Sequence, residues 1–276
     1  MTPTVAIIMR AFNEMPHVQR SLAMLECQTF RDFDLYAVDS GSTDGTFEAL
    51  NQACEPEHLT RIAAQEYMPG KVLNEVISRT DHEIIVLLNA DAIPLSDDWL
   101  ERLIAPILDG HADAAFSRQV ARHDARFIVA YDYQRAYNPA KISPGFYSAV
   151  ACAFRRELWD THKFREYGYA EDTIWARECI QAGSRILMAA DSEVEHSHNY
   201  TLKELFAKKR RQAAALAESK SLRPRLAAEI YVCCRELVRD FCYALFRLKL
   251  ATIPYNLAYR VVAHAGIYKG LREGCP

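Results

Sequence analysis

The chain has 276 residues, half of them hydrophobic and a quarter charged, which excludes disordered and fibrous proteins and allows a sizeable core. The formal net charge of −3 conceals an asymmetry: residues from Thr201 onward carry 15 Lys/Arg against 6 Asp/Glu, which leaves 18 against 30 before them. This basic C-terminal part suggests an anionic partner. The eight cysteines form no C-x-x-C pair, and neither a signal peptide nor 18 consecutive apolar residues occur. We therefore expect a cytoplasmic protein with reduced thiols and no membrane span.

In the first half of the chain, short apolar runs alternate with stretches of helical periodicity. The expected strand and helix pairs are 5–9 with 16–27, 35–38 with 46–53, and 83–88 with 97–108. This alternation predicts an α/β fold with a mainly parallel sheet wrapped by helices. Ligands of such sheets bind at the carboxyl ends of the strands, so the residues that follow each run are the candidate site residues.

The second half predicts a mixture of strands and helices, and then helices alone. We expect a strand over 114–120, a helix over 125–137, a further apolar run at 146–154, a helix from about Glu171 to Gly183, and a strand over 185–189. From Leu202 the pattern is helical. The predicted organisation is therefore one domain over 1–201, which changes character near residue 111, and a helical, basic extension over 202–276.

Polar motifs follow the first two predicted strands at the same edge of the sheet. Phe12-Asn13-Glu14 follows the first strand, and the segment 39–46 (Asp-Ser-Gly-Ser-Thr-Asp-Gly-Thr) follows the second. A pyrimidine offers an N3 donor to a carboxylate, a face to an aromatic ring and ribose hydroxyls to a second carboxylate. Asp39, Phe12 and Glu14 supply these three groups. The alternative is that Ser42 and Asp44 only cap the next helix.

Oxygen and nitrogen ligands follow two later strands. Asn89-Ala90-Asp91 ends the strand 83–88, where a carboxylate could anchor a divalent cation bound to a diphosphate. His196 and His198 follow a later strand, and imidazole with carboxylate suits manganese or a similar ion better than calcium. Each of these residues, taken singly, is also common in structural roles.

Two carboxylates, Glu171 and Asp172, open the predicted helix that ends at Gly183. The helix dipole favours negative charge at this end, so a simple N-cap is one interpretation. The other is a catalytic base, for which geometry in the transition state matters more than a raised pKa.

Taken in the order in which they occur along the chain, with Glu171-Asp172 before His196, the five motifs resemble family-2 glycosyltransferases of the GT-A fold, and more narrowly the bacterial rhamnosyltransferase-like members, over roughly residues 4–215. The resemblance implies a nucleotide-sugar half over about 1–111 and an acceptor half over about 112–201. The implied nucleotide-binding residues are Phe12, Glu14, Asp39, Ser42, Lys71 and Asn74; Asn89 and Asp91 would meet the donor sugar or metal; Asp91 with His196 or His198 would bind metal; Asp172, with Glu171 beside it, would be catalytic; and Tyr147, Tyr169 and Trp175 would lie on the acceptor side.

The same resemblance implies an inverting transfer, dependent on Mn²⁺ or Mg²⁺, from a UDP- or dTDP-sugar, dTDP-rhamnose among the options. The acceptor would be a hydroxyl of a cell-surface glycan or a lipid-linked saccharide, and no nucleic-acid partner is expected. Two residues depart from the family pattern, since Ser40 and Asn89 each stand where an Asp is usual. We therefore expect weak metal binding in the absence of nucleotide.

Other functions remain as alternatives. A sugar-nucleotide nucleotidyltransferase would use a similar core, but the segment Arg10–Glu14 lacks the Gly-rich loop that it normally needs. A dinucleotide oxidoreductase is disfavoured because no G-x-G-x-x-G follows the first strand. A non-catalytic nucleotide- or glycan-binding module is the third alternative.

The basic C-terminal extension has two interpretations. Its basic and apolar segments are 208–211, 230–250 and 260–269. They could make peripheral contact with an anionic membrane, where lipid-linked acceptors reside. The alternative is that they are solvated basic faces of helices that pack across the catalytic core.

Overall fold

The computed structural model describes residues 3–143, 145–220 and 225–274. They form two compact units. The sheet unit comprises residues up to Arg122, 133–167 and 171–196, and the helical unit comprises 123–132, 168–170 and the residues from Ser197 onward.

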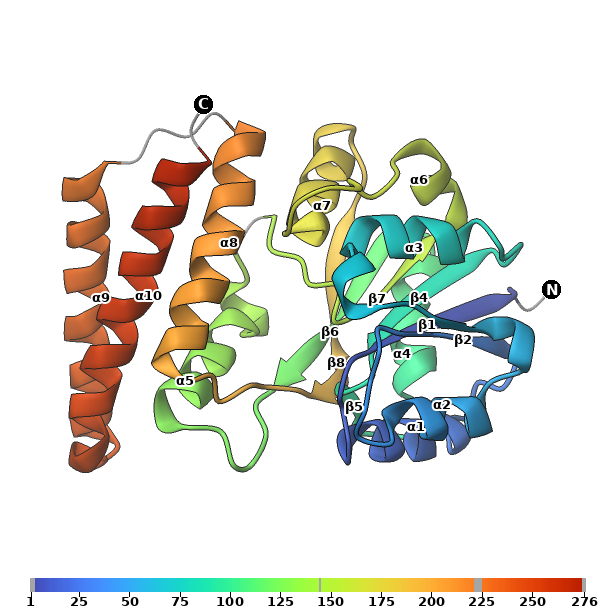
Figure 1. The fold of residues 1–276 in the computed structure, drawn as a ribbon, viewed down its shortest axis with the longest axis horizontal. Helices are drawn as coiled ribbons and strands as arrows, with labels where there is room; N and C mark the ends of the chain where they lie inside the picture. Colours follow the sequence, from blue (N-terminus) through green and yellow to red (C-terminus); the bar gives the residue numbers. More distant parts are fainter. Residues whose placement is uncertain (1–2, 144, 221–224, 275–276) are drawn as a thin grey trace. The chain divides into compact units, whose positions relative to one another are not determined.

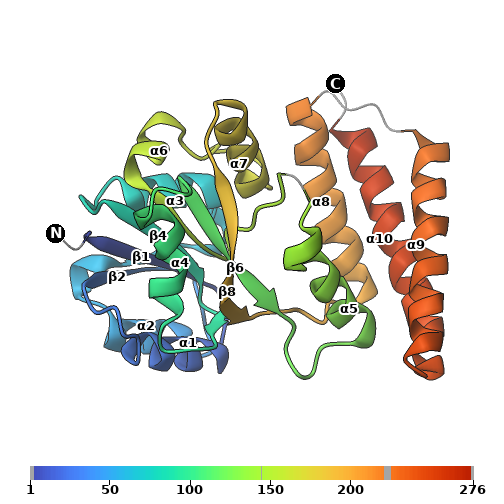
Figure 2. The same cartoon turned by 180° about the vertical axis from the view of Figure 1, so that it is seen from behind.

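The sheet unit contains eight strands with helices on both faces (Figures 1 and 2). Its first half consists of β1 (Val5–Ala11), α1 (His17–Glu26), β2 (Phe33–Asp39), α2 (Thr46–Ala53), η1 (Pro56–His58), β3 (Leu59–Arg61), η2 (Ala64–Glu66), α3 (Pro69–Ile77), β4 (Ile84–Asn89), β5 (Ile93–Pro94) and α4 (Trp99–Leu108). Its second half consists of β6 (Ala114–Val120), η3 (Pro139–Lys141), β7 (Ala151–Arg155), α6 (Arg156–Thr161), α7 (Glu171–Gln181) and β8 (Ile186–Glu195), while α5 (Phe127–Ala136) passes from the helical unit into it.

The strand order is β3-β2-β1-β4-β7-β6-β8-β5. Strands β3, β2, β1 and β4 are parallel, β7 is antiparallel to both β4 and β6, and β8 pairs parallel with β6. The α/β fold expected from the alternation of apolar runs and helices is confirmed, and the sheet is mixed in its second half. The parallel order brings the carboxyl ends of β1, β2 and β4 to one edge.

The central strands are apolar on both faces because helices cover both. In β1, Val5, Ile7 and Met9 face one buried cluster, whereas Ala6 and Ile8 face the other. Burial on both sides explains why the strands appear in the sequence as continuous apolar runs. The polar residues at their ends consequently stand out as candidates for function.

Several predicted elements agree closely with the structure, and others do not. The helix 46–53 and the strand 114–120 have the predicted bounds. The run 146–154 contributes only its last part to a strand, which begins at Ala151, and β8 extends well beyond the predicted 185–189. The helix α3 was not among the predicted elements. At its start, a Cβ on Gly70 would lie 1.9 Å from the carbonyl oxygen of Arg165, so this helix depends on a contact far along the chain.

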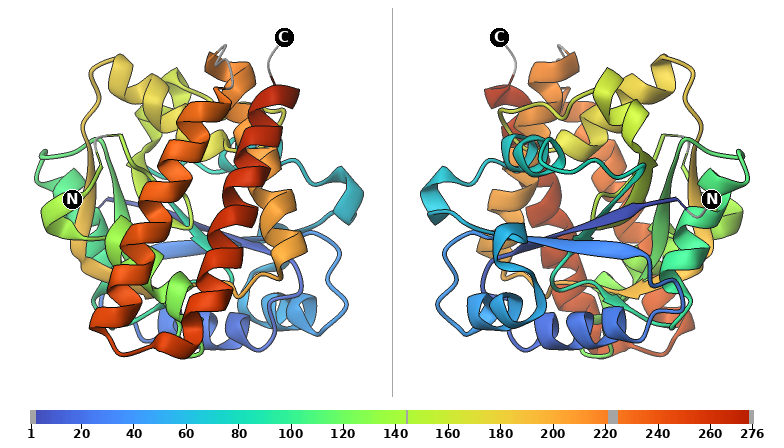
Figure 3. Two further views of the ribbon diagram at one scale, coloured as in Figure 1. Left: turned by 90° about the vertical axis from the view of Figure 1, so that its left-hand side faces the viewer. Right: turned by 90° about the vertical axis from the view of Figure 1, so that its right-hand side faces the viewer.

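The helical unit is built on three long helices, α8 (Leu202–Lys220), α9 (Leu226–Phe246) and α10 (Ile253–Glu273), with η4 (Leu250–Thr252) before the last (Figure 3). Helix α10 packs against both α8 and α9. Gly266 and Gly270 allow a close approach to α8, because a Cβ on either would lie 2.7 Å or less from a carbonyl oxygen of that helix. Across the described residues, no helix combines the length and apolar character that crossing a bilayer requires.

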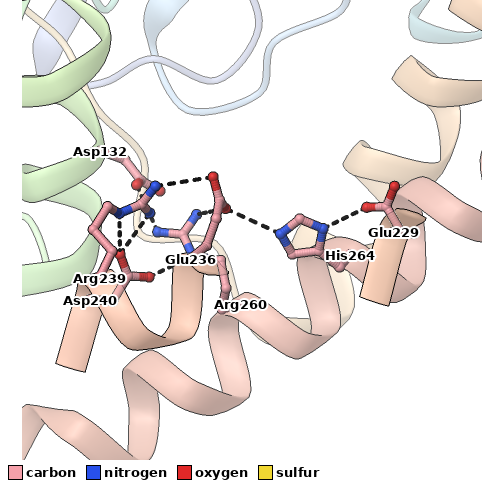
Figure 4. A network of polar contacts seen from close by, with 7 residues as sticks. All are labelled: Asp132, Glu229, Glu236, Arg239, Asp240, Arg260 and His264. Atoms are coloured by element: carbon pink, nitrogen blue, oxygen red, sulfur yellow. Dashed lines mark hydrogen bonds and ion pairs between the residues drawn. The ribbon is translucent and has the colours of Figure 1, made fainter. Parts of the chain in front are cut away.

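A network of charged residues joins α9 to α10 and to α5 (Figure 4). The Arg260 guanidinium lies 2.7 Å from both Asp132 and Asp240, and 3.3 Å from Glu236. His264 lies between Glu236 and Glu229, at 3.1 and 2.5 Å. Part of the positive charge expected on a solvated face therefore lies inside this unit.

The basic run 208–211 is likewise engaged within the helical unit. Burial lowers the pKa of Lys209, and Lys208 donates to the Tyr200 hydroxyl. Arg210 approaches Glu273 at 3.5 Å. These side chains make contacts inside the helical unit. An exposed basic surface would therefore have to be formed by other residues of the extension.

Candidate functional site

The loops that follow β1 and β2 are tied together by reciprocal hydrogen bonds. The Asn13 amide donates to the Ser42 hydroxyl at 2.9 Å, and the Thr43 amide donates back to Asn13 Oδ1 at the same distance. The Glu14 amide donates to the Thr46 hydroxyl at 2.8 Å. The Asn-Glu and Gly-Ser-Thr-Asp-Gly-Thr motifs therefore form one folded wall, and the predicted nucleotide residue Ser42 helps to build that wall.

Asp39 lies at the end of β2, and its side chain is fully buried. Its Oδ1 accepts from the amides of Gly41 and Ser42 at 3.1 and 3.0 Å, whereas Oδ2 has no hydrogen-bond partner among the described residues. A buried carboxylate oxygen without a partner is costly, which points to a ligand that donates to it. Phe12 follows Ala11, the register partner of Asp39, and is 48% exposed. A flat heterocycle with an N–H group fits this pair.

Asp91 and His196 meet just beyond the ends of β4 and β8. The imidazole Nδ1 lies 2.9 Å from Gln119 Oε1, and the Gln119 amide donates to the Ser148 hydroxyl at 2.8 Å. In the neutral ring, an acceptor at Nδ1 places the proton on that nitrogen and directs the lone pair to Nε2. Nε2 lies 3.4 Å from Asp91 Oδ2, and both residues are buried. The pair fits a shared divalent cation.

Two charged side chains border Asp91. Arg122 donates to the Asp91 carboxylate at 2.9 Å, and both side chains are largely buried. Burial, together with the nearby Asp91 charge, raises the pKa of Glu14 to about 8, against the opposing effect of Arg122. Glu14 therefore lies within the electrostatic influence of Asp91.

Arg10, the penultimate residue of β1, connects the ends of three elements. Its guanidinium lies 3.3 Å from Glu171 and donates to Asn89 Oδ1 at 2.9 Å and to the Ala149 carbonyl at 3.3 Å. The Asn89 oxygen is therefore engaged by Arg10. Burial and the adjacent Asp172 raise the pKa of Glu171, while Arg10 opposes that rise. Glu171 is the carboxylate held in a buried ion pair.

Asp172 has a different environment from its neighbour. Its Oδ1 accepts from the Thr173 amide at 2.7 Å, and its Oδ2 lies 3.4 Å from the Ala149 amide. Among the described residues, no Lys, Arg or His forms an ion pair with it. Of the two adjacent acids, Asp172 is the one whose carboxylate is not committed to Arg10.

Several predicted site residues lie in the packed interior instead. Tyr147 and Trp175 are buried in the aromatic core, where they donate to Cys152 Sγ and to the His162 carbonyl. The structure contradicts the placement of both on an acceptor surface, because neighbouring rings cover them. Asn74 uses its amide to bind Phe164 and Trp159 and is also buried, so it holds α3 in place and is not open to a nucleotide.

Of the remaining predicted residues, Lys71 and Tyr169 are exposed and His198 is half-buried. Lys71 is exposed on α3 and approaches Glu75 at 3.8 Å. Tyr169 and His198 belong to the helical unit, in which Tyr169 lies under the Arg211 guanidinium and the His198 ring stacks on Tyr200.

Sequence reasoning did not identify Arg10, Arg122 or Gln119. Arg10 lies inside an apolar run and could have been noticed as the one charge in it. Arg122 and Gln119 follow or end β6, the position at which the other strands were searched for polar residues. A polar residue at the end of a strand is therefore the sequence signal for Gln119 and Arg122.

The chain was compared with known proteins. Residues 6–163 match the model of "Glycosyl transferase family 2". The chain is 27% identical over 217 residues to the O-antigen chain rhamnosyltransferase RfbN of Salmonella typhimurium, covering 73% of this chain and 69% of that protein. It is 29% identical over 194 residues to the O-antigen chain rhamnosyltransferase WbaN of Salmonella anatum, covering 65% and 61%. The chain thus spans about two thirds of the length of these relatives.

Solved structures show the same fold. The mannosyltransferase PcManGT from Pyrobaculum calidifontis, in complex with GDP-Man and Mn²⁺, has a TM-score of 0.68 and 21% identity, covering 98% of this chain and 88% of that one. Glucosyl-3-phosphoglycerate synthase from Mycobacterium tuberculosis, in complex with Mg²⁺ and UDP, has a TM-score of 0.59 and 20% identity, covering 78% and 79%. The architecture is that of the GT-A fold, and because the family model matches more than half of the sequence, the chain belongs to glycosyl transferase family 2.

Proposed function

We propose that this glycosyltransferase moves a sugar from a pyrimidine nucleotide diphosphate, a UDP- or dTDP-sugar, to a hydroxyl of a cell-surface glycan or lipid-linked saccharide. The observation that carries the proposal is the gathering of Asp39, Asp91 and the pair Glu171-Asp172 around the carboxyl ends of β1, β2 and β4. In this arrangement residues 1–111 would hold the donor and residues 112–201 would present the acceptor, with residues 202–276 as an extension.

The donor assignment rests on Asp39. Its Oδ2 is buried without a hydrogen-bond partner among the described residues, and it would accept the N3–H of uracil or thymine while the exposed Phe12 ring covers the base. Glu14, on the same wall, would meet the ribose. A guanine donor, such as the one named with PcManGT, is the main rival, because its N1–H could also reach a carboxylate.

The diphosphate would lie between the base and the sugar, beside Asp91. Mn²⁺ or Mg²⁺ held by Asp91 and His196 would neutralise the charge that develops on the departing diphosphate. Arg122, 2.9 Å from Asp91, is placed to add a fixed positive charge on the same side. His198, two residues after His196, is the candidate for a further ligand.

The acceptor hydroxyl would be activated by Asp172. Arg10 holds Glu171 in an ion pair, so the neighbouring carboxylate keeps a lone pair available to take the acceptor proton as the new bond forms. Attack on the face opposite the diphosphate inverts the anomeric configuration. Asn89, bound by Arg10, would border the donor sugar.

The sugar and acceptor are inferred from the relatives. Two of them are named as O-antigen chain rhamnosyltransferases, which makes dTDP-rhamnose the first donor to test and a growing O-antigen-type saccharide the first acceptor. Donor synthesis and lipid-linked acceptors would place the enzyme in the cytoplasm, in peripheral contact with the membrane.

The test is transfer by Asp172→Asn, assayed with a panel of nucleotide sugars and Mn²⁺. Asparagine keeps the size of the side chain and one oxygen that can accept from the Thr173 amide, so folding and donor affinity should survive. Transfer should fall by about 10²- to 10⁴-fold, the usual contribution of a general base. The matched control is Glu171→Gln, which keeps an acceptor for Arg10 and should lose much less activity. Wild-type turnover by Asp172→Asn would contradict the role of Asp172 as the base, whereas absence of transfer by the wild type with every donor of the panel would favour a binding module.

A further inference from the structure

The outer face of α9 is apolar although it is open to solvent. Its exposed large hydrophobic side chains recur at helical spacing, and they are Leu226, Ile230, Tyr231, Val238, Phe241 and Leu245. A helix of a water-soluble protein usually presents charged residues on this side. A continuous exposed apolar stripe of this kind marks a surface that meets a partner.

The stripe continues into the turn after α9, which is the most exposed apolar part of the helical unit. Phe246 and Leu248 are 81% and 85% exposed, and Leu250 is 54% exposed. Arg247 and Lys249 alternate with them and are also exposed. We refer to residues 246–250 as the apolar corner. Three hydrophobic side chains and two cations are thus displayed together at one turn.

The acidic residues of α9 all face the other way. Glu229 and Glu236 contact His264, and Asp240 contacts Arg260, so every carboxylate of the helix binds a residue of α10 (Figure 4). The outward charges of α9 and the corner are therefore only positive. Apolar side chains flanked by cations, without acids among them, complement a surface that is hydrophobic below and anionic above.

We propose that the outer face of α9 and the apolar corner bind the surface of an anionic lipid bilayer. Helix α9 has 21 residues, about 31 Å of length, and would lie in the plane of the interface with its apolar side chains below the headgroups. Arg247 and Lys249 would meet the lipid phosphates. A second copy of the chain is a poorer occupant, because this surface carries no outward acid that could pair with the cations of another copy.

This inference deepens the peripheral contact in the proposed function and relocates it from the basic run 208–211, whose side chains are engaged inside the helical unit. It does not depend on the chemistry of transfer, because binding to vesicles needs neither donor nor acceptor. Failure of vesicle binding and failure of glycosyl transfer are therefore separate outcomes.

The experiment is cosedimentation of the full chain with vesicles of phosphatidylglycerol and phosphatidylethanolamine, compared with vesicles of phosphatidylcholine. The test variant is Phe246→Ser/Leu248→Asn/Leu250→Ser. Asparagine suits position 248 because Leu248 has a φ of 56°, a conformation that Asn tolerates. We expect the wild type to bind the anionic vesicles and the affinity of the variant for them to be lower by about tenfold at least.

A second variant, Arg247→Gln/Lys249→Gln, separates the charge contribution. It should weaken binding to anionic vesicles by roughly fivefold for each cation and leave binding to phosphatidylcholine unchanged. Added salt should weaken the wild type in the same way.

The matched control is Leu95→Ser/Leu108→Ser/Leu187→Ser, which removes three leucines that are 43–45% exposed in the sheet unit. It should bind like the wild type, and all variants should keep the wild-type circular dichroism and donor affinity. Equal loss in this control, or no binding of the wild type to anionic vesicles, would overturn the proposal. A concentration-dependent dimer that the corner variant dissociates would assign the surface to a second copy of the chain instead.

Discussion

Arg10 offers the sharpest test of how the site is held together. Its guanidinium lies 3.3 Å from Glu171, and both side chains are only 11% exposed. Arg10→Leu removes this partner and also the donors to Asn89 and Ala149. Because Glu171 would remain a buried acid without its cation, we expect a loss of about 3–5 kcal/mol in the free energy of unfolding.

The assay is urea denaturation followed by tryptophan fluorescence. All three tryptophans, Trp99, Trp159 and Trp175, are buried in the sheet unit, so the signal reports the unit that contains the ion pair. Glu171→Leu should be destabilising for the converse reason, since it leaves a buried guanidinium. The double variant removes both charges, so its loss in the free energy of unfolding should be smaller than the sum of the two single losses by roughly 2 kcal/mol.

Additivity would refute this reasoning. If the losses of the two single variants sum to that of the double variant within about 0.5 kcal/mol, the two side chains are not coupled. A loss below about 1 kcal/mol for Arg10→Leu would mean that water already screens the pair, as at exposed sites.

Four further results are expected. Asp39→Asn should weaken UDP or dTDP binding by roughly 1.5–3 kcal/mol in calorimetry, and preference for GDP over both would remove Asp39 from N3. Excess EDTA should abolish transfer, and Asp91→Asn should raise the metal concentration required; undiminished turnover in chelator would exclude the metal role. Gly270→Ala places a Cβ 2.1 Å from a carbonyl of α8, so thermal unfolding should report a loss of about 1–3 kcal/mol. His264 has a raised pKa, so it stabilises the fold below pH 6.5, and this stabilisation is lost as the pH rises through its folded pKa. Glu236 has a pKa lowered to about 2, so it stabilises the fold above pH 4.5, and this stabilisation is lost as the pH falls toward 2. The difference in melting temperature between the wild type and His264→Gln should therefore be largest between pH 4.5 and pH 6.5.

The fold could be predicted from the sequence where local pattern and burial agree. The strand Val5–Ala11 is apolar on both faces because helices cover both, and the helix Thr46–Ala53 begins directly after Gly45. Each element can therefore be predicted from its own residues and their immediate neighbours. Helix α3 was missed because its position depends on Gly70 contacting Arg165 across the chain. Contacts between distant residues are not encoded in periodicity.

The same distinction applies to the candidate site. Asp39 and Asp91 follow strands and could be named from their position alone. The sequence alone could not distinguish Trp175 and Asn74 from residues that bind a ligand, since only the fold reveals that other side chains cover them. Arg10 stands out in the sequence as a charge in an apolar run, but its role depends on Glu171, which lies 161 residues away.

The charged network of the helical unit also bears on how α9 finds its orientation. A helix with apolar residues on both sides could rotate about its own axis and pack the wrong side inward at little cost in hydrophobic burial. Turning α9 inside out would strand Arg260 and His264 opposite apolar side chains and break the ion pairs with Asp240 and Glu236. Unpaired buried charges are far more costly than exchanged apolar contacts. The ion pairs therefore determine which side of α9 faces α10. The opposite side can consequently be as hydrophobic as binding to a partner requires, without a risk that the helix packs in the wrong orientation.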